Sequence, residues 1–406
     1  MKNVFDAAAP TSSSTTTSGT AAGAGSVATS VMAPPGVDAA RPPRAGRLRV
    51  LDGLRLVAAL SVVVFHFTSR DSYAWGQHPW EQFPQLSRVT QYGELGVNLF
   101  FVISGFVILM SAWGRSVENF AISRVTRLFP AYWVAVGLTS VLLMSKVADS
   151  GLDLWEAVAN LTMVHSAMDV RHVDGVYWTL WVELRFYLLI GVMLLWGLTK
   201  GRVVSLIVFW PLAAALAKNT DQSLLSTLLI WEYAPYFCVG MALYLIYREG
   251  HKVFYWLLVA YNWAFIVGLT GRHHPTKPLG KTHYLPSLLV EVLLITLCIV
   301  LVALCTSRKA QEINWRWLTT AGALTYPLYL IHEDWGQFFI SRLREQLPPY
   351  VTLAVATAAC LAMAWLVHIA IERPMAPRVK RWLRSGLDSV RTDRIETRPS
   401  SVPSEG

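Results

Sequence analysis

The chain has 406 residues, of which 54% are hydrophobic and 15% are charged, and its net charge is +9 at pH 7. Soluble domains carry roughly a quarter charged residues, so this composition excludes an ordinary soluble domain and indicates a polytopic membrane protein. The basic excess does not indicate nucleic-acid binding, because the basic residues form short clusters between apolar stretches, where membrane topology requires them.

The N-terminal segment, residues 1–47, is rich in Ala, Ser, Thr, Gly and Pro and has few large apolar side chains. Such a segment cannot bury enough apolar surface to offset the entropy lost on ordering, so we predict a disordered tail. No short apolar core with a cleavage site precedes residue 50, which argues against a removable signal peptide.

Apolar segments of about the length of a spanning helix, roughly 20 residues, recur after this tail. We therefore predict an all-α polytopic membrane protein, a bundle of about ten transmembrane helices within a membrane domain at residues 48–375. The predicted spans are residues 50–70, 95–113, 129–146, 177–198, 203–218, 230–247, 253–270, 285–306, 318–339 and 350–371. Residues 376–406 are predicted to form a basic juxtamembrane segment and a disordered tail.

The distribution of Lys and Arg predicts the orientation of the bundle. With the N-terminus placed in the cytoplasm, the cytoplasmic loops carry 19 Lys and Arg residues against 10 on the other side. This bias predicts a multi-pass protein of the plasma (inner) membrane, surrounded by lipid, with both termini cytoplasmic. No internal repeat is apparent, and the sequence indicates no particular oligomeric state.

The first span holds two ionisable side chains, Arg55 and His66, in the stretch "LRLVAALSVVVFHF". At about 100° per residue, an offset of eleven puts them within about 20° of each other and about 16 Å apart along one helix face. Asp52 lies near the same stripe and can pair with Arg55. Ionisable groups inside a membrane usually face a polar interior, so this face is a candidate site. A snorkelling Arg and a His satisfied in the core are the simpler alternatives.

Glu183 and His332 are predicted to lie at the depth of His66, in the outer half of the fourth and ninth spans. A His with a carboxylate neighbour suits general-base catalysis, because imidazole accepts a proton at neutral pH and the carboxylate stabilises the imidazolium. The alternative is a structural latch between Glu183 and either Arg185 or His332. Ser104 in "FFVISGFV" is the best candidate nucleophile, although small-residue helix packing explains it more simply.

Arg124 and Arg127 come just before the predicted third span, in "AISRVTRLFPAYW". Their spacing of three residues puts both guanidinium groups on one helix face, where they can bind phosphate. A positive-inside topology signal is the simpler explanation of such a pair.

No metal site or disulfide is predicted, because no CxxC or Cys/His ligand spacing occurs. His273 and His274 lie in a predicted outer loop, residues 271–284, that could touch an acceptor, and solvated loop histidines are commoner than metal ligands. The four cysteines are Cys238, Cys298, Cys305 and Cys360.

Together these stretches resemble the acyltransferase-3 family of integral membrane O-acyltransferases over about residues 48–375. Each motif is short, but the ordered set is specific, and no motif is missing. The motifs are Arg55 and His66 in the first span, "GVNLFFVISGFVI" in the second, the R-x-x-R pair Arg124 and Arg127, "YWTLWVELRFYLL" with Glu183, "YPLYLIH" with His332, and "IERP" with Glu372. We expect no appended periplasmic hydrolase-like domain in 406 residues.

The resemblance implies transfer of an acyl group, usually acetyl, from cytoplasmic acyl-CoA to a hydroxyl of a carbohydrate or glycosylated acceptor. It implies that His66 is the catalytic base and that Glu183 is its functional partner. Arg55, Arg124 and Arg127 would contact the CoA phosphates or line the donor path. Acyl-CoA is then a co-substrate, and no tightly bound cofactor is expected.

We hypothesise direct attack of the acceptor hydroxyl on the thioester, with no acyl-enzyme. The oxyanion stabiliser is left open among Arg55, Tyr177 and Trp178. Asp52, Ser104 and His332 complete the candidate lining of the site.

Two acceptor classes and one other class of function remain as alternatives. The acceptor is either a surface or lipid-linked glycan or a hydrophobic small molecule such as a macrolide. A proton-coupled transporter also uses intramembrane His and Glu, but the lack of a repeat and the paired arginines favour an acyl-CoA enzyme. A non-catalytic scaffold would have no use for the buried polar groups.

Overall fold

The structure is a computed structural model that describes residues 48–145, 151–273 and 282–396. Across these ranges the secondary structure is helical and includes no strand, which confirms the all-α prediction. The predicted N-terminal tail, residues 1–47, lies outside the described residues. The predicted limits of the membrane domain stay a prediction.

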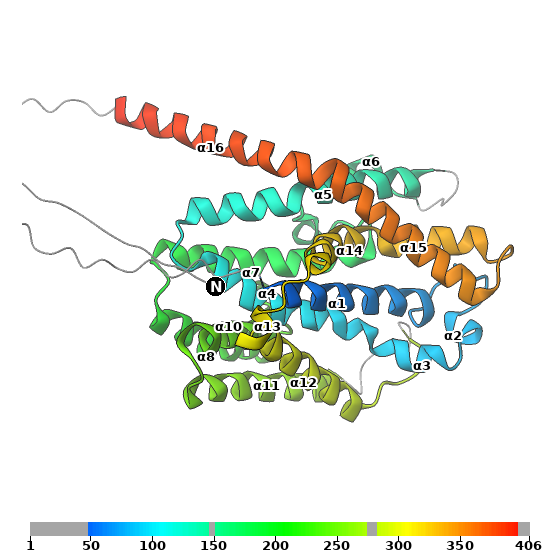
Figure 1. Cartoon of the computed structure of the whole chain (residues 1–406), viewed down its shortest axis with the longest axis horizontal. Coiled ribbons are helices and arrows are strands. Elements are labelled where there is room, and N and C mark those ends of the chain that lie inside the picture. The colour runs from blue at the N-terminus through cyan, green and yellow to red at the C-terminus, as the bar shows by residue number, and fades with distance from the viewer. Residues whose placement is uncertain (1–47, 146–150, 274–281, 397–406) are drawn as a thin grey trace, which may run out of the picture. The chain divides into compact units, whose positions relative to one another are not determined.

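A helix occupies each of the ten segments that were predicted to span the membrane (Figure 1). These helices are α1 (Arg49–Thr68), α4 (Leu95–Ala112), α5 (Val117–Met144), α7 (Trp178–Leu195), α8 (Lys200–Asn219), α10 (Ala234–Glu249), α11 (Val253–His273), α12 (Leu288–Cys305), α14 (Arg316–Leu343) and α15 (Pro349–Val367).

Eight helical segments of the described chain are long and apolar enough to cross a membrane. Helices α10 and α14 are not among them. Helix α10 has only 16 residues, and α14 carries the consecutive polar residues His332, Glu333 and Asp334. A count of about ten spans therefore remains a prediction.

Short helices connect the long ones. They are α2 (Pro79–Gln82), α3 (Leu86–Thr90), η1 (Gln91–Glu94), α6 (Leu154–Asn160), η2 (His165–Met168), η3 (Gly175–Tyr177), α9 (Ser223–Leu228) and α13 (Arg308–Gln311). Helix α6 begins at a capping box, in which the Asp153 amide donates to Glu156 Oε2 at 3.0 Å. This pair satisfies backbone groups that the first turn of a helix leaves unbonded.

Helix α4 lies inside the bundle and packs most extensively against α10. The two backbones meet at glycines, because a Cβ atom on Gly105 would collide with the backbone of Phe237, and one on Gly240 with the backbone of Val102. Small residues permit this approach, and van der Waals packing then stabilises helix pairs that lipid alone would not drive together.

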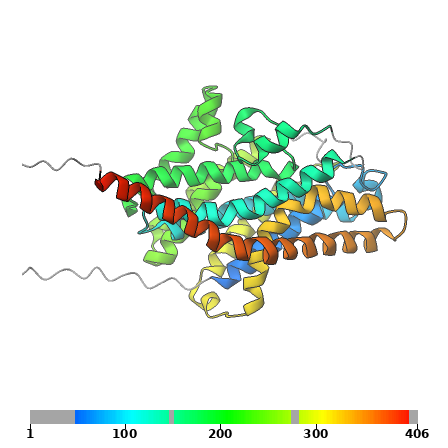
Figure 2. The same ribbon diagram turned by 90° about the horizontal axis from the view of Figure 1, so that it is seen from above.

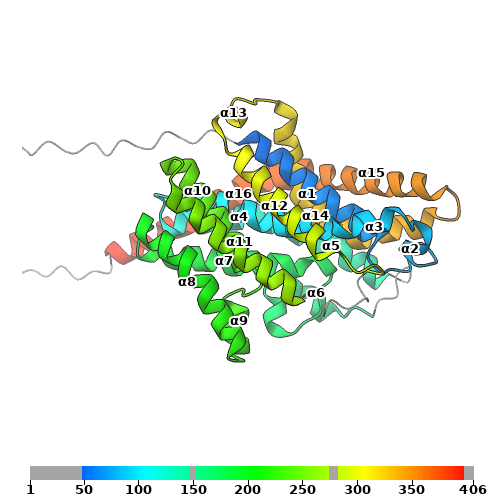
Figure 3. The same cartoon turned by 90° about the horizontal axis from the view of Figure 1, so that it is seen from below.

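Helices α1 and α14 pack side by side and run in the same direction, because hydrogen bonds join the regions near their starts and near their ends. Near the start of both, Arg49 Nη1 donates to the carbonyl of Asn314 at 2.5 Å. Beyond the end of α1, Arg344 Nη1 donates to the carbonyl of Ala74 at 3.3 Å. Helices α11 and α12 cover the face of the bundle that Figure 3 shows from below. The packing of α1 against α14 determines which residues of these two helices face each other at the candidate site.

Residues Arg373–Glu396 form a helix, α16, where we expected a basic segment followed by a disordered tail. Apolar residues recur every fourth position from Val379 to Leu387, which gives the helix one apolar face. A π-helical turn, η5 (His368–Glu372), joins α15 to α16, and Figure 2 shows the two helices following one another from orange to red. Helix α16 packs against α5.

Candidate active site

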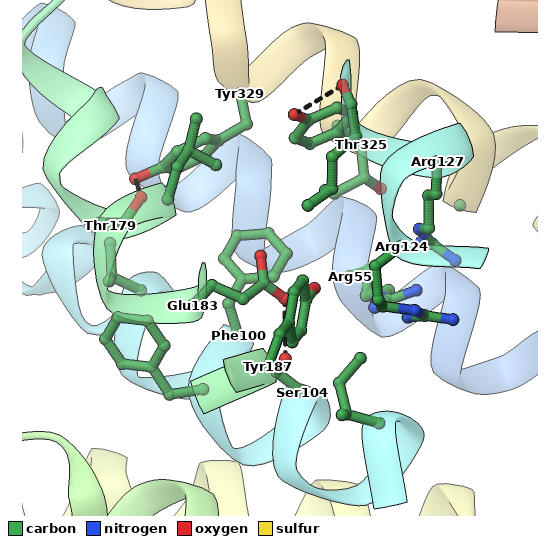
Figure 4. A pocket seen from close by; sticks show the side chains of 17 residues that line it. Arg55, Phe100, Ser104, Arg124, Arg127, Thr179, Glu183, Tyr187, Thr325 and Tyr329 are labelled. Carbon is green, nitrogen blue, oxygen red and sulfur yellow. Dashed lines mark hydrogen bonds between the residues drawn. The ribbon is translucent and has the colours of Figure 1, made fainter. Parts of the chain in front are cut away.

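A pocket of about 90 Å³ lies between α1, α4, α5, α7 and α14. Its walls combine an apolar surface with three arginines, one glutamate and several hydroxyl groups (Figure 4). The lining residues are Arg55, Val97, Phe100, Phe101, Ser104, Ile108, Arg124, Arg127, Leu128, Thr179, Leu180, Glu183, Tyr187, Gly322, Thr325, Tyr326 and Tyr329.

The three arginines come together although they belong to two helices. Figure 4 shows Arg55 from α1 beside Arg124 and Arg127 from α5, gathered on one side of the pocket. The Arg124 guanidinium lies over the Tyr187 ring, 5.8 Å from its centroid. The R-x-x-R pair lies inside α5 rather than before it, because the polar first turns from Val117 continue the same helix.

Glu183 faces this cationic side from α7. Its Oε1 accepts a hydrogen bond from Ser104 Oγ at 2.7 Å. In a pocket of low dielectric an acid of this kind offsets part of the charge of the three arginines. The Ser104 hydroxyl therefore directs its proton to the Glu183 carboxylate.

The two histidines meet one helical turn beyond the pocket. His66 Nδ1 lies 2.7 Å from His332 Nε2, and the rings stack with centroids 4.9 Å apart and planes 19° apart. Both are buried, with 6% and 0% of their surface exposed. His332 Nδ1 lies 2.9 Å from the carbonyl oxygen of Tyr329, a residue of the pocket wall.

These contacts fix which nitrogen carries each proton when both rings are neutral. A carbonyl oxygen only accepts hydrogen bonds, so His332 Nδ1 must carry the proton and donate to Tyr329. In the neutral ring His332 Nε2 is then unprotonated and has a free lone pair. That lone pair accepts the Nδ1 proton of His66. The basic nitrogen of His66 is therefore Nε2, which points away from His332.

His66 and Glu183, which we predicted to act together, each form a hydrogen bond to another residue. His66 bonds to His332, whereas Glu183 bonds to Ser104 within the pocket. Tyr329 lines the pocket together with Glu183, its ring lies 5.6 Å from the His332 ring between centroids, and its hydroxyl lies 2.9 Å from Thr179 Oγ1. The predicted roles of His66 and Glu183 remain predictions.

Some of the other predicted site residues lie at the pocket or at the histidine pair, and some do not line the pocket. Ser104 lines the pocket, and His332 contacts His66. Asp52, Tyr177 and Trp178 are not among the lining residues. The Tyr177 hydroxyl donates to the Leu330 carbonyl at 3.2 Å, and Asp52 lies against Gly322 of α14.

Sequence reasoning did not select Tyr187, Thr325 or Tyr329 as part of the site. The available signal was spacing: Tyr187 follows Glu183 by one helical turn, and Tyr329 precedes His332 by three residues. Both tyrosines were read only as parts of longer motifs.

No group of three or more His, Cys, Asp or Glu side chains that could hold a metal ion occurs in residues 48–145, 151–273 and 282–396. The predicted outer loop with His274 lies mostly outside these ranges. The candidate site therefore offers cationic, apolar and imidazole groups to a ligand.

Comparison with known proteins identifies the family. Residues 48–369 match the model of the acyltransferase-3 family, which is described as an acyltransferase domain. The chain belongs to the acyltransferase-3 family. This finding confirms the resemblance seen in the motifs.

Two known acyltransferases match parts of the chain. It is 31% identical over 155 residues to the acyltransferase MdmB of Streptomyces mycarofaciens, covering 36% of this chain and 39% of that protein. It is 32% identical over 98 residues to the putative peptidoglycan O-acetyltransferase YrhL of Bacillus subtilis (strain 168), covering 22% of this chain and 13% of that protein. The chain thus matches less than half the length of either relative. No solved structure matches.

Proposed function

We propose that this protein is an O-acyltransferase that moves an acyl group, in the simplest case acetyl, from acyl-CoA to a hydroxyl of a carbohydrate or glycosylated acceptor. The observation that carries the proposal is the convergence of Arg55, Arg124 and Arg127 on one pocket. Guanidinium groups bind phosphate bidentately, and CoA is a cytoplasmic polyanion. A membrane acyltransferase needs such a site for its donor.

The pocket also suits the apolar arm and thioester of the donor. Phe100 and Phe101 line it beyond the arginines, and it ends at Tyr329. The thioester must pass the layer formed by Tyr329, Thr179 and Phe100 to reach His66, which lies one turn further on. The arginine end is assigned to the cytoplasm, which makes both termini cytoplasmic.

His66 acts as the general base in this proposal. Its Nε2 removes the proton of the acceptor hydroxyl while the oxygen attacks the thioester carbonyl carbon. The tetrahedral intermediate then collapses, the carbon–sulfur bond breaks, and the thiolate takes the proton from His66 and leaves as CoA. His332 holds His66 in the required tautomer, and Glu183 offsets the charge of the arginine cluster.

A glycan is the favoured acceptor class, because YrhL is named as a putative peptidoglycan O-acetyltransferase. A hydrophobic small molecule such as a macrolide is the alternative. Mass spectrometry of surface glycans and secreted metabolites, with and without the gene, decides between them. We expect one product class to lose one acyl unit in the deletion strain and in a His66→Gln strain, and an unchanged set of products would contradict the proposal.

The donor site has its own test. Arg124→Ala and Arg127→Ala should each raise the KM for acetyl-CoA about tenfold, because a charged hydrogen bond contributes roughly 1.5–3 kcal/mol, and should change kcat much less. The matched control is Arg115→Ala, an exposed arginine just before α5 that does not line the pocket. An unchanged KM in both pocket variants would remove the assigned role.

A further inference from the structure

A fourth arginine, Arg70, contacts the His66 nitrogen that the proposed reaction needs. Arg70 Nη1 lies 3.1 Å from His66 Nε2, one turn along the chain and just beyond the end of α1. The same Nη1 forms an ion pair with Glu333 Oε1. Glu333 follows His332 on α14, so the ion pair joins the two helices that carry the histidine pair.

The direction of this contact follows from the histidine tautomers. Because His332 accepts the Nδ1 proton of His66, the remaining lone pair of His66 is on Nε2. Arginine only donates, so Arg70 occupies that lone pair. The nitrogen assigned to the acceptor hydroxyl is thus already hydrogen-bonded in this structure.

The position of Glu333 is closely defined by its surroundings. Only 7% of its side chain is exposed, against 32% for Arg70. A Cβ atom on Gly175 would lie 2.7 Å from Glu333 Oε2, so the glycine leaves room for this carboxylate. Burial, with the neighbouring carboxyl groups of Asp334 and Glu333, raises the pKa of Asp174 well above its usual value. The carboxylate that holds Arg70 is that of Glu333.

We propose that Arg70 is a displaceable cover on the catalytic base, held by Glu333, and that the acceptor hydroxyl binds His66 by replacing it. This inference rests on the proposed function. It also assigns the side of acceptor entry, because the half-exposed Arg70 lies at the end of α1 opposite the arginine pocket.

The cover explains how water is kept from the thioester. Water activated at His66 Nε2 would attack the same carbonyl carbon, break the carbon–sulfur bond and release free acid and CoA. While Arg70 donates to Nε2, that lone pair is not available to water. An acceptor that replaces Arg70 leaves the guanidinium beside Glu333, where its charge stays paired.

The test measures hydrolysis of acetyl-CoA by the full-length protein in lipid nanodiscs without acceptor, followed as free CoA thiol. We expect Arg70→Met to hydrolyse acetyl-CoA at least tenfold faster than the wild type. Glu333→Gln, which loosens Arg70, should give a smaller increase. Arg70→Lys should stay near the wild-type rate, because an ammonium group can still donate to Nε2 and pair with Glu333.

Two controls separate the cover from a general loss of structure. The double variant Arg70→Met, His66→Gln should return to the background rate, since the water must be activated at His66. Arg342→Met should match the wild type, because Arg342 lies in the last turn of α14 and stacks over Phe338 at 5.4 Å. A purely structural role for Arg70 would lower hydrolysis and would not raise it.

The inference is wrong if well-folded Arg70→Met hydrolyses acetyl-CoA at the wild-type rate. Should Arg70→Met fail to fold, an unchanged rate in Glu333→Gln overturns it in the same way. Failure of the proposed function is distinct, because it appears as the absence of any acylated product in cells that carry the wild-type gene.

Discussion

The orientation of the His66 ring depends on groups that lie on another helix. Its Nδ1 bonds to His332, which in turn bonds to the Tyr329 carbonyl. A general base needs the correct tautomer as well as a suitable basicity, and a neighbour that accepts the distal proton supplies it. At the scale of the residue, catalysis should therefore depend on position 332 almost as much as on position 66.

His332→Leu and His332→Gln test this dependence. We expect His332→Leu to lower kcat about 100-fold, within the range of general-base catalysis, because leucine cannot accept the Nδ1 proton of His66. His332→Gln should lose less, since its amide oxygen can accept that proton. The measurement is kcat for product formation at saturating acetyl-CoA, and equal kcat values in the two variants would contradict the assignment.

A second histidine pair lies outside the membrane segments, in the connection between α6 and α7. His165 Nε2 lies 2.7 Å from His172 Nδ1, and His165 is fully buried. Burial, with a smaller effect of His172, lowers the pKa of His165 to about 4. The folded protein thus binds fewer protons here than the unfolded chain between about pH 4 and pH 6.5.

The stability of the protein should consequently fall on acidification through this window. We expect the Tm in detergent to drop by a few °C between pH 7 and pH 5, and His165→Gln to reduce that drop. Thermal unfolding of both proteins at a series of pH values measures the effect. Parallel pH profiles for wild type and variant would show that His165 is not responsible.

At the scale of the element, the close contact of α4 and α10 holds Ser104 in position to bond to Glu183. Both Gly105 and Gly240 touch the backbone of the opposite helix. A side chain at either position must force the helices apart, because the atoms it would meet belong to the backbone and cannot rotate away. The contact therefore connects packing to the shape of the pocket.

Gly240→Ala should destabilise the protein by about 1–3 kcal/mol, the usual cost of overpacking a close interface. Gly191→Ala on α7 is the matched control, because a Cβ atom there meets nothing within 4 Å. Thermal denaturation in detergent compares the two variants. Equal Tm values would contradict the close approach of α4 and α10.

The hydropathy of the sequence predicted the positions of the long helices well. The contacts between side chains of different helices were predicted less well. All ten apolar segments are helical, and the polar first turns of α5 were missed because they carry no apolar signal. The R-x-x-R spacing correctly predicted that Arg124 and Arg127 share a face. The partner of His66 could not be read from spacing, because His332 is 266 residues away and only helix packing brings it near.

At the scale of the whole molecule, the ten helices of the predicted spans alternate in direction along the chain, so α14 is parallel to α1, whereas α16 continues in the direction of α15. This order puts the start of α5 and the turn η2 at opposite ends of the bundle. If the arginine end is cytoplasmic, Arg115 faces the cytoplasm and Ala167 faces the outside.

Cysteine labelling tests this orientation. In a variant with alanine at positions 238, 298, 305 and 360, a membrane-impermeant maleimide on intact cells should label Ala167→Cys. It should label Arg115→Cys only after the cells are permeabilised, because that position would face the cytoplasm. Both positions are exposed at the surface of the bundle, so a cysteine at either can react. The reverse pattern would place the arginine pocket outside and remove its access to cytoplasmic acyl-CoA.

The 266-residue separation of His66 and His332 has a consequence for biosynthesis. A nascent chain that has inserted α1 and α5 already holds all three arginines, but the pocket lacks its α14 wall and His66 lacks His332 until α14 emerges from the ribosome. Chains truncated by a premature stop before α14 should therefore lack both a closed pocket and an oriented imidazole, and they should form no acylated product.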